Sequence, residues 1–223
     1  EAQANGYAER NPEADVEGYD ACRKIAILSS LISGQQVDFE DIYCEGITEI
    51  TVEDMKYARK IGATIKLLAS SRRYAGNRLH AIVAPCMLYP SHPLYNVNDV
   101  FNAVCVEGNM LGASMFYGSG AGKLPTASAV AGDMVDAARH LGKIITTFWN
   151  PQKLELAPVG EMTHRFFVRM KSDAKDAKVF GDVEMIDAKI KGEIGFMTPV
   201  MSEDAFARKA KNLDIISMIR VAG

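Results

Sequence analysis

The sequence has little cysteine, a single tryptophan and no long apolar run. Its four cysteines among 223 residues include no CxxC pair and have no histidine at zinc-ligand spacing, which excludes the common structural zinc sites. No apolar run reaches the roughly 18 residues of a membrane span, and no signal peptide is visible, so we expect a cytoplasmic protein with no membrane partner. Because each cysteine lies in an apolar stretch, we expect buried thiols in a reducing compartment.

A surplus of charge is also missing. Lys and Arg number 25 and Asp and Glu number 28, so the formal net charge is only −3. The densest basic clusters, "SSRRYAGNR" and "KSDAKDAK", are short and interrupted, which argues against a nucleic-acid partner. With 48% hydrophobic and 24% charged residues, the composition is that of a globular protein with one large domain or two small ones.

Residues 11–33 contain the clearest helix pattern. Asp15 is a suitable N-cap and Gly34 is a suitable stop. From Ala21 onward nearly every position is apolar or small, which is typical of a helix that is buried on all sides. We therefore expect one continuous, buried helix here.

The rest of the first 147 residues predicts further helices and hairpins. In chain order we expect a helix at 51–62 with Thr51 and Asp54 at capping-box spacing, hairpins at 63–88 and 100–118, and a helix from Pro125 to about Leu141. This order predicts an α+β domain, in which helices cover a mostly antiparallel sheet.

The last third of the chain has a different element order. Residues 148–162 contain two prolines and are expected to form a linker. Residues 163–223 then predict the order strand, helix, strand, strand, helix, strand, which is the ferredoxin-like βαββαβ plan. The sequence therefore predicts one domain at 1–147 and a second at 163–223.

Asp20 and Lys24 form the first candidate functional pair. They are four residues apart, so they share one helix face and can form an ion pair. One interpretation is an ordinary surface pair of little energetic weight. The other is a substrate site, because Glu9, Asp15 and Asp20 suit the ammonium group of an amino acid and the lysine suits an oxygen. Spacing alone leaves both interpretations open.

The stretch "YGSGAGKLPTASAV", residues 117–130, is the second candidate. Tyr117 stands where a Walker A loop needs its first glycine, and Leu124 follows the lysine where that motif needs Ser or Thr. A dinucleotide fingerprint fails as well, because Lys123 takes the place of its last glycine. Two interpretations remain: a tight turn alone, or a helix start that binds a phosphate or carboxylate.

Four motifs together resemble the catalytic half of homoserine dehydrogenase, in order from residue 1 to about 142. They are "GYAERNPEADVEGYDACRKIAIL", "VDFEDIYCEGITEIT", "HPLYNVNDVFNAV" and "YGSGAGKLPTASAVAGD". The resemblance implies a reversible, NAD(P)-linked interconversion of L-homoserine and L-aspartate 4-semialdehyde, in the synthesis of threonine, methionine and isoleucine. The segment "HRFFVRMK…DIISMIRV" resembles the ACT-type regulatory domain that follows in many members.

The resemblance assigns roles to single residues. In the family motif G-x-D-x-x-R-K the lysine is the acid/base, and this role falls on Lys24. The acid of the motif, which binds substrate and orients the lysine, falls on Asp20. The family's substrate-binding glutamate falls on Glu9, and Asp15 matches a further acid of the site.

The resemblance also implies a cofactor, NAD or NADP. The family's G-x-G-A-G turn falls on Gly118, Gly120 and Gly122, and its last glycine lies against the nicotinamide, so Gly120 and Gly122 are the predicted cofactor contacts. We expect the family's N-terminal Rossmann domain, which holds most of the cofactor, to be missing here. The chain alone is therefore predicted to be inactive. A monovalent cation is implied only for the full-length enzyme, and we predict no metal ligand in this chain.

The edges of the catalytic-domain sheet and of the ACT-like sheet both need cover, which favours self-association. We expect a homo-oligomer, a dimer or tetramer, that acts on a small-molecule substrate. The first helix of the ACT-like part, "SDAKDAKVFGD", is short and the Pro-Gly turn that binds an effector is absent, so we expect a degenerate regulatory module.

Two rival functions stay open. One is an amino-acid-sensing module without chemistry, which predicts effector binding independent of Lys24. The other is a related semialdehyde reductase, which predicts a cysteine in a polar, activating context.

Overall fold

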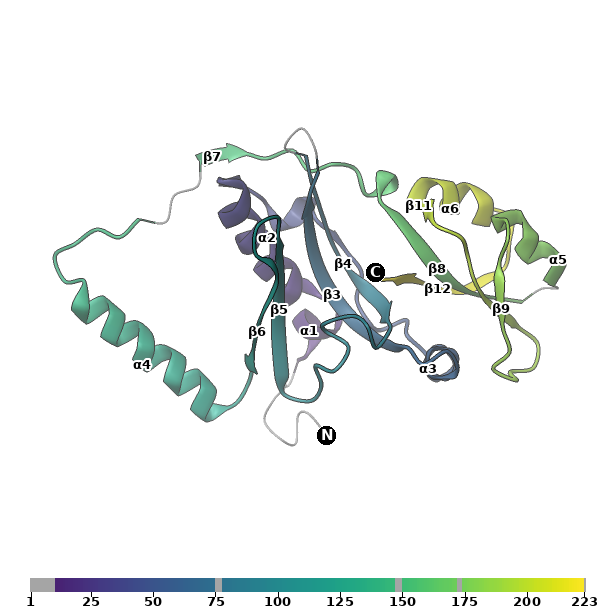
Figure 1. Cartoon of the computed structure of the whole chain (residues 1–223), viewed down its shortest axis with the longest axis horizontal. Helices are drawn as coiled ribbons and strands as arrows, with labels where there is room; N and C mark the ends of the chain where they lie inside the picture. The colour runs from purple at the N-terminus through teal and green to yellow at the C-terminus, as the bar shows by residue number, and fades with distance from the viewer. Residues whose placement is uncertain (1–10, 75–77, 147–149, 172–173, 223) are drawn as a thin grey trace. The chain divides into compact units, whose positions relative to one another are not determined.

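The computed structural model describes residues 11–74, 78–146, 150–171 and 174–222. The chain divides into two compact units, and Figure 1 follows it through the elements of both. The larger unit contains Glu13–His92 and Trp149–Gly223, and the smaller contains Glu1–Pro12 and Pro93–Phe148. Among the described residues, no helix is long and apolar enough to cross a membrane.

A mixed sheet is the centre of the larger unit (Figure 1). Its strands follow one another in the order β2 (Tyr43–Cys44), β4 (Leu79–Leu88), β12 (Ile215–Val221), β8 (Thr163–Met170), β10 (Ile194–Met197) and β9 (Glu184–Ile186). Two further strands pair with members of this row: β3 (Thr64–Arg73) with β4, and β11 (Met201–Ser202) with β8.

The expected mostly antiparallel sheet needs a correction, because β4 has two parallel neighbours. It pairs in parallel with β2 at Ile82 and Val83, and with β12 at Cys86 and Met87. Parallel pairs join strands that are far apart in the chain, so hairpin signals between consecutive strands do not reveal them. The result is a mixed sheet that includes strands from both of the segments 1–147 and 163–223.

Both predicted hairpins are confirmed. Strands β3 and β4 pair antiparallel over their whole length, from Thr64 opposite Leu88 to Arg73 opposite Leu79. In the smaller unit, β5 (Phe101–Gly108) pairs antiparallel with β6 (Gly112–Ser119). For both hairpins, the runs of strand-forming residues and the turn residues between the strands were sufficient to predict the pairing.

The helix predicted at 11–33 is interrupted. It consists of α1 (Glu13–Val16) and α2 (Tyr19–Ser33), separated at Gly18, whose φ of 79° is left-handed. Gly18, not Asp15, is the N-cap of α2, so the predicted cap was wrong. The stop at Gly34 is confirmed, with a left-handed φ of 72°.

Only one face of α2 is buried, which corrects the expectation of a helix buried all round. Cys22, Ala26 and Ser30 lie at helical spacing on the buried face, and the two apolar residues pack with Val83 of β4. Outward-facing Ile27, Leu31 and Ile32 are 44–55% exposed. Apolar composition therefore overstated the burial of this helix.

The second predicted helix, α3 (Val52–Lys60), has the expected capping box. The Thr51 hydroxyl accepts a hydrogen bond from the Asp54 N–H at 3.3 Å, and the Asp54 carboxylate accepts one from the Thr51 N–H at 2.8 Å. Arg169 of β8 donates to the same two side chains. The cap of α3 is thereby fixed to the sheet.

Strand β8 separates two layers of the core. Phe166, Val168 and Met170 contribute to one apolar cluster, which includes Phe206 of α6 (Glu203–Ala210). Phe167, at the intervening position, contributes to another, which includes Tyr57 of α3. Period-two alternation thus places helices on opposite faces of the strand.

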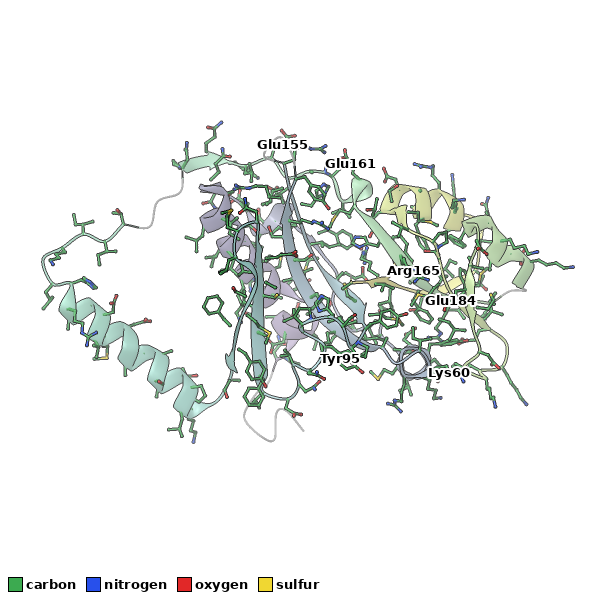
Figure 2. The ribbon with its side chains drawn as sticks, viewed as in Figure 1. Lys60, Tyr95, Glu155, Glu161, Arg165 and Glu184 are labelled. Carbon is green, nitrogen blue, oxygen red and sulfur yellow. The ribbon has the colours of Figure 1, made fainter. Side chains whose placement is uncertain are left out.

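The C-terminal elements follow the predicted order. Between β8 and β9 lie α5 (Ala174–Ala177) and a 3-10 turn, η4 (Lys178–Phe180). Arg165 and Glu184 lie side by side (Figure 2) and connect β8 to β9 through an exposed ion pair of 3.0 Å.

The expected linker contains short elements of its own. Residues 148–162 include β7 (Asn150–Lys153), which pairs in parallel with β1 (Gln35–Gln36), and the 3-10 turn η3 (Val159–Glu161). A further 3-10 turn, η1 (Phe39–Asp41), follows β1. The domain boundaries at 147 and 163 remain a prediction.

The smaller unit consists of the β5–β6 hairpin and α4 (Lys123–Arg139). The helix begins two residues earlier than predicted, with Pro125 in its first turn and Gly122 as N-cap. No residue of α4 is buried.

Candidate active site

The candidate site lies at the start of α2. Lys24 Nζ is 2.6 Å from Asp20 Oδ2, one helical turn away on the same face. The two side chains are 70% and 46% exposed, so both groups are open to solvent and to a substrate. The predicted pairing of Asp20 with Lys24 is therefore present in the structure.

Gly18 sets where this helix begins. Its left-handed φ of 79° is costly for other residues, and a Cβ here would lie 3.1 Å from Val83 Cγ1 and 3.3 Å from Cys44 Sγ. Its carbonyl accepts the first helical hydrogen bond of α2, from the Cys22 N–H at 2.9 Å. Glycine at this position lets α2 start directly against β4, two residues before Asp20.

Residues 43–47, here called the support segment, hold the same turn from the other side. The Ile47 N–H donates to the Val16 carbonyl at 2.7 Å, and the Cys44 thiol donates to the Glu17 carbonyl at 3.3 Å. Gly46 approaches Val16 and Glu17 so closely that a Cβ would collide with their backbone. The start of α2 is thus fixed mainly through backbone contacts.

The other predicted substrate contacts are placed unequally. Asp15 lies exposed in α1, and its carbonyl accepts a hydrogen bond from the Gly18 N–H at 3.3 Å. Glu9 lies outside the described residues. Arg23, adjacent to Lys24 in sequence, holds its guanidinium 5.5 Å from the centre of the Phe39 ring.

Thiol chemistry is not favoured near this pair. Burial, together with the neighbouring Cys44 thiol, raises the pKa of Cys22 to about 11. Burial also raises the pKa of Cys44, and it raises that of Cys86 in β4 to about 12. Such thiols stay protonated at neutral pH and are poor nucleophiles.

The predicted cofactor glycines lie in the smaller unit, at the end of β6. The Gly120 N–H donates to the Val100 carbonyl at 3.0 Å, and a Cβ at Gly120 would collide with the side chain of Asn102. Gly122 has a φ of 115° and starts α4 without a side-chain cap. The first N–H groups of α4 are therefore available to a polar ligand.

A cavity elsewhere in the larger unit does not include these residues. It has a volume of about 450 Å³ and is lined by Asp41, Ala81, Lys153, Glu155, Leu156, Ala157, Pro158 and Val159. Its lysine already forms ion pairs of 3.1 and 2.8 Å with Asp38 and Asp41. Within the described ranges, no group of three or more His, Cys, Asp or Glu side chains could hold a metal ion.

Sequence reasoning missed two residues that bear on this site, Glu45 of the support segment and Arg220 of β12. Their side chains form an ion pair of 2.7 Å, although they are 175 positions apart. The motif "DIYCEGI" contains Glu45, but nothing in its spacing points to Arg220.

Comparison with known proteins gives one consistent family. The family model for homoserine dehydrogenase matches residues 1–135. The homoserine dehydrogenase of Mycobacterium tuberculosis is 47% identical over 176 residues, which cover 76% of this chain and 40% of the relative. That of Bacillus subtilis is 35% identical over 239 residues, which cover 99% of this chain and 55% of the relative. The chain spans about half the length of these curated relatives.

Solved structures agree. A homoserine dehydrogenase from Thiobacillus denitrificans matches with a TM-score of 0.81 at 31% identity, covering 99% of this chain and 57% of that chain. The S. aureus homoserine dehydrogenase matches with a TM-score of 0.78 at 27% identity, covering 100% of this chain and 57% of that chain. The described fold is thus similar to part of these structures.

Proposed function

Because the chain belongs to the homoserine dehydrogenase family, we propose that it supplies the substrate-binding half of an enzyme that interconverts L-homoserine and L-aspartate 4-semialdehyde. One observation carries the proposal: Lys24 and Asp20 form a 2.6 Å ion pair at the start of α2, open to solvent and inside the family-matched segment. An ammonium group and a carboxylate on one face suit a substrate that has an oxygen to protonate and an ammonium to bind.

Lys24 acts as the acid and base. In the direction of aldehyde reduction, its ammonium group polarises the carbonyl and donates a proton to the oxygen as the carbon accepts a hydride. In the direction of oxidation, the neutral amine accepts the proton of the substrate hydroxyl. Because the side chain is 70% exposed, solvent can restore its proton between turnovers.

Asp20 positions the lysine and contributes to substrate binding. Its carboxylate holds the ammonium group of Lys24 on one side of the helix. The lysine side chain therefore loses less conformational freedom when the substrate binds. Asp15, which lies in α1 before the break at Gly18, is the proposed second carboxylate for the substrate ammonium. Glu9 is the proposed third.

The described residues are suited to contact only one part of a nicotinamide dinucleotide, the nicotinamide ring. Gly120 and Gly122 precede the uncapped start of α4, where N–H groups can approach a polar ring substituent. The sequence contains no strand, G-x-G-x-x-G turn and helix that would hold the diphosphate. NAD or NADP, when bound, supplies the hydride acceptor and donor, and we propose that other parts of the whole protein hold most of it.

Residues 163–223 are proposed to be a degenerate ACT-like regulatory module. The sheet order β12, β8, β10, β9 supports this, because it places the fourth, first, third and second strands of the βαββαβ unit side by side, all antiparallel. The same observation favours a second candidate function, the sensing of an amino acid by this module without chemistry. Titration of the Lys24→Ala variant with threonine, by calorimetry, tests it.

The proposal extends to assembly and location. Strands β3 and β9 each have an edge that no described strand covers, and such edges favour self-association, so we propose a homodimer or homotetramer. A cytoplasmic location, and a role in the synthesis of threonine, methionine and isoleucine, complete the proposal. A monovalent cation belongs to the whole enzyme.

Activity in a reconstituted protein tests the function. We would join this chain to the residues that precede the matched region in the M. tuberculosis homoserine dehydrogenase. Homoserine-dependent formation of NADH or NADPH by the fusion is the expected result. A folded fusion that binds the nicotinamide cofactor but does not oxidise homoserine would contradict the proposal.

A further inference from the structure

Arg220 is almost completely buried, and its guanidinium bonds to carboxylates on two sides. It lies near the end of β12 and is only 2% exposed. Its Nε donates to Glu203 Oε1 at 2.7 Å and its Nη2 to Glu203 Oε2 at 3.1 Å, which is a bidentate pair with the first residue of α6. Its Nη1 donates to Glu45 Oε2 at 2.7 Å. One guanidinium thus connects the proposed regulatory module to the support segment.

Glu45 is held on a second side by its neighbour. The Tyr43 hydroxyl donates to Glu45 Oε2 at 3.1 Å, and the Tyr43 ring lies 5.2 Å from the Arg220 guanidinium carbon. The Glu45 N–H donates to the Val83 carbonyl of β4 at 2.8 Å. Side chain and backbone therefore fix Glu45 independently, and only the side-chain contact reaches β12.

From Glu45 the support segment leads directly to the candidate site. The next residue, Gly46, lies against the backbone of Val16 and Glu17, and Ile47 donates to the Val16 carbonyl. Val16 and Glu17 lead into Gly18, the N-cap of α2. Because Gly46 lies so close to the backbone of Val16 and Glu17, we expect a displacement of Glu45 to be passed on to the α1–α2 turn.

We propose that Arg220 and Glu45 are positioning residues, through which the ACT-like module sets the start of α2 and thereby the geometry of Asp20 and Lys24. The catalytic meaning of this device rests on the function proposed above. The contacts of Arg220 and Glu45 do not depend on that function.

A second buried arginine provides the matched comparison. Arg169 of β8 is 3% exposed and bonds to Asp54 at 2.9 Å and to Glu193 at 2.8 Å. Like Arg220, it keeps one carboxylate if the other is removed. Its partners belong to the start of α3 and to the β9–β10 connection, and among the described residues no hydrogen bond or ion pair joins Asp54 or Glu193 to the support segment.

Amide hydrogen exchange of the chain, measured by mass spectrometry, distinguishes a specific effect of Glu45 on the α1–α2 turn from a general loss of stability. In Glu45→Leu, the N–H groups of Glu17, Gly18 and Ile47 are expected to exchange about 10-fold faster than in the wild type. In Glu193→Leu the same groups are expected to stay within about twofold, although both variants remove one carboxylate from a buried arginine. Glu45→Gln, which keeps an oxygen acceptor for Arg220 and Tyr43, is expected to restore most of the protection.

Equal exchange at the α1–α2 turn in the two leucine variants would overturn the proposal, whether both rise or neither does. Loss of protection across β8 as well in Glu45→Leu would indicate a merely structural role and would overturn it too. The exchange result does not depend on activity. If the wild-type fusion fails to oxidise homoserine, the proposed function fails and the positioning is still decided.

If the fusion is active, its kinetics provide a second readout. The value of kcat/KM for homoserine is expected to fall about 10-fold in Glu45→Leu and to change less than about twofold in Glu193→Leu, because small displacements of catalytic groups are costly. Equal values in the two variants would overturn the positioning role in catalysis.

Discussion

The ammonium group of Lys24 lies 2.6 Å from the carboxylate of Asp20, and both side chains face solvent. An exposed pair one turn apart contributes only a few tenths of a kcal/mol to stability. The role proposed for this pair is therefore in the reaction and not in the stability of the fold. The two roles can be separated, because one is visible in unfolding and the other in turnover.

Asp20→Asn should reduce activity without destabilising the fold. In the fusion we expect kcat/KM for homoserine to fall by about 10- to 100-fold, because the amide orients the lysine and binds the substrate ammonium less strongly. The free energy of unfolding should change by less than about 0.5 kcal/mol. Glu53→Gln, which removes the carboxylate of the exposed Lys56–Glu53 pair, is the control and should change neither. Equal activity in the two variants would contradict the role of Asp20.

Gly46→Ala should destabilise the larger unit. The added Cβ would collide with the Val16 carbonyl oxygen and lie 2.6 Å from Glu17 Cα, and backbone cannot move aside as a side chain can. We expect a loss of about 1–3 kcal/mol, measured by urea denaturation. Gly132→Ala, inside α4 with no atom within 4 Å, is the same change in open space and should not destabilise. A Gly46→Ala protein as stable as the wild type would show that the turn is not closely packed.

Thiol labelling should be slow at Cys22 and Cys86, because burial of the thiols raises their pKa values. With pKa values of about 11 and 12, Cys22 and Cys86 carry a thiolate in roughly one molecule per thousand or fewer at pH 8, so they should react with a disulfide reagent only after unfolding. The half-buried Cys105 of β5 should be labelled first. Mass spectrometry of peptides from briefly labelled native protein measures this. Labelling of Cys22 as fast as Cys105 would contradict the described packing of α2.

Stability should decrease below neutral pH because of His164. Burial lowers its pKa below the usual 6.5, the neighbouring Glu203 opposes this in part, and Arg220 adds to it. As the pH falls through about 6.5, the unfolded chain binds a proton that the native chain does not, so the free energy of unfolding decreases until the folded pKa is reached.

Denaturation curves between pH 8 and pH 5 measure this effect of His164. The wild type should lose more stability over this range than His164→Gln, which has no group to titrate at that position. Burial also lowers the pKa values of His80 and His92, so some dependence on pH remains in the variant. Parallel curves for the two proteins would show that His164 is not responsible.

Local patterns predicted much of the fold. The β3–β4 and β5–β6 hairpins, the capping box of α3 and the stop at Gly34 all depend on neighbouring residues, and all were found where the sequence indicated. The break at Gly18 was missed, because a glycine within a helical pattern does not reveal a left-handed φ. The close approach of Val83 and Cys44, which leaves little room for a Cβ, exists only in the folded chain. Parallel pairing of β4 with β12 has no local signal at all.

The site was predictable to the same extent. Four-residue spacing placed Asp20 beside Lys24, because helix geometry fixes that distance. Glu45 and Arg220 could not be found in this way, since 175 positions separate them and only the assembled sheet brings them together. The resemblance carried by "GYDACRK" gave Lys24 its role, which spacing alone left open.

The most direct test of this account is the turnover of homoserine by the fusion carrying Lys24→Ala, compared with Lys60→Ala. Lys60 is an exposed lysine at the end of α3 (Figure 2), so its removal controls for the loss of one surface charge. We expect kcat to fall by about 100-fold or more in Lys24→Ala while homoserine still binds, and Lys60→Ala to behave as the wild type. Turnover that survives in Lys24→Ala would contradict the assignment of the acid and base.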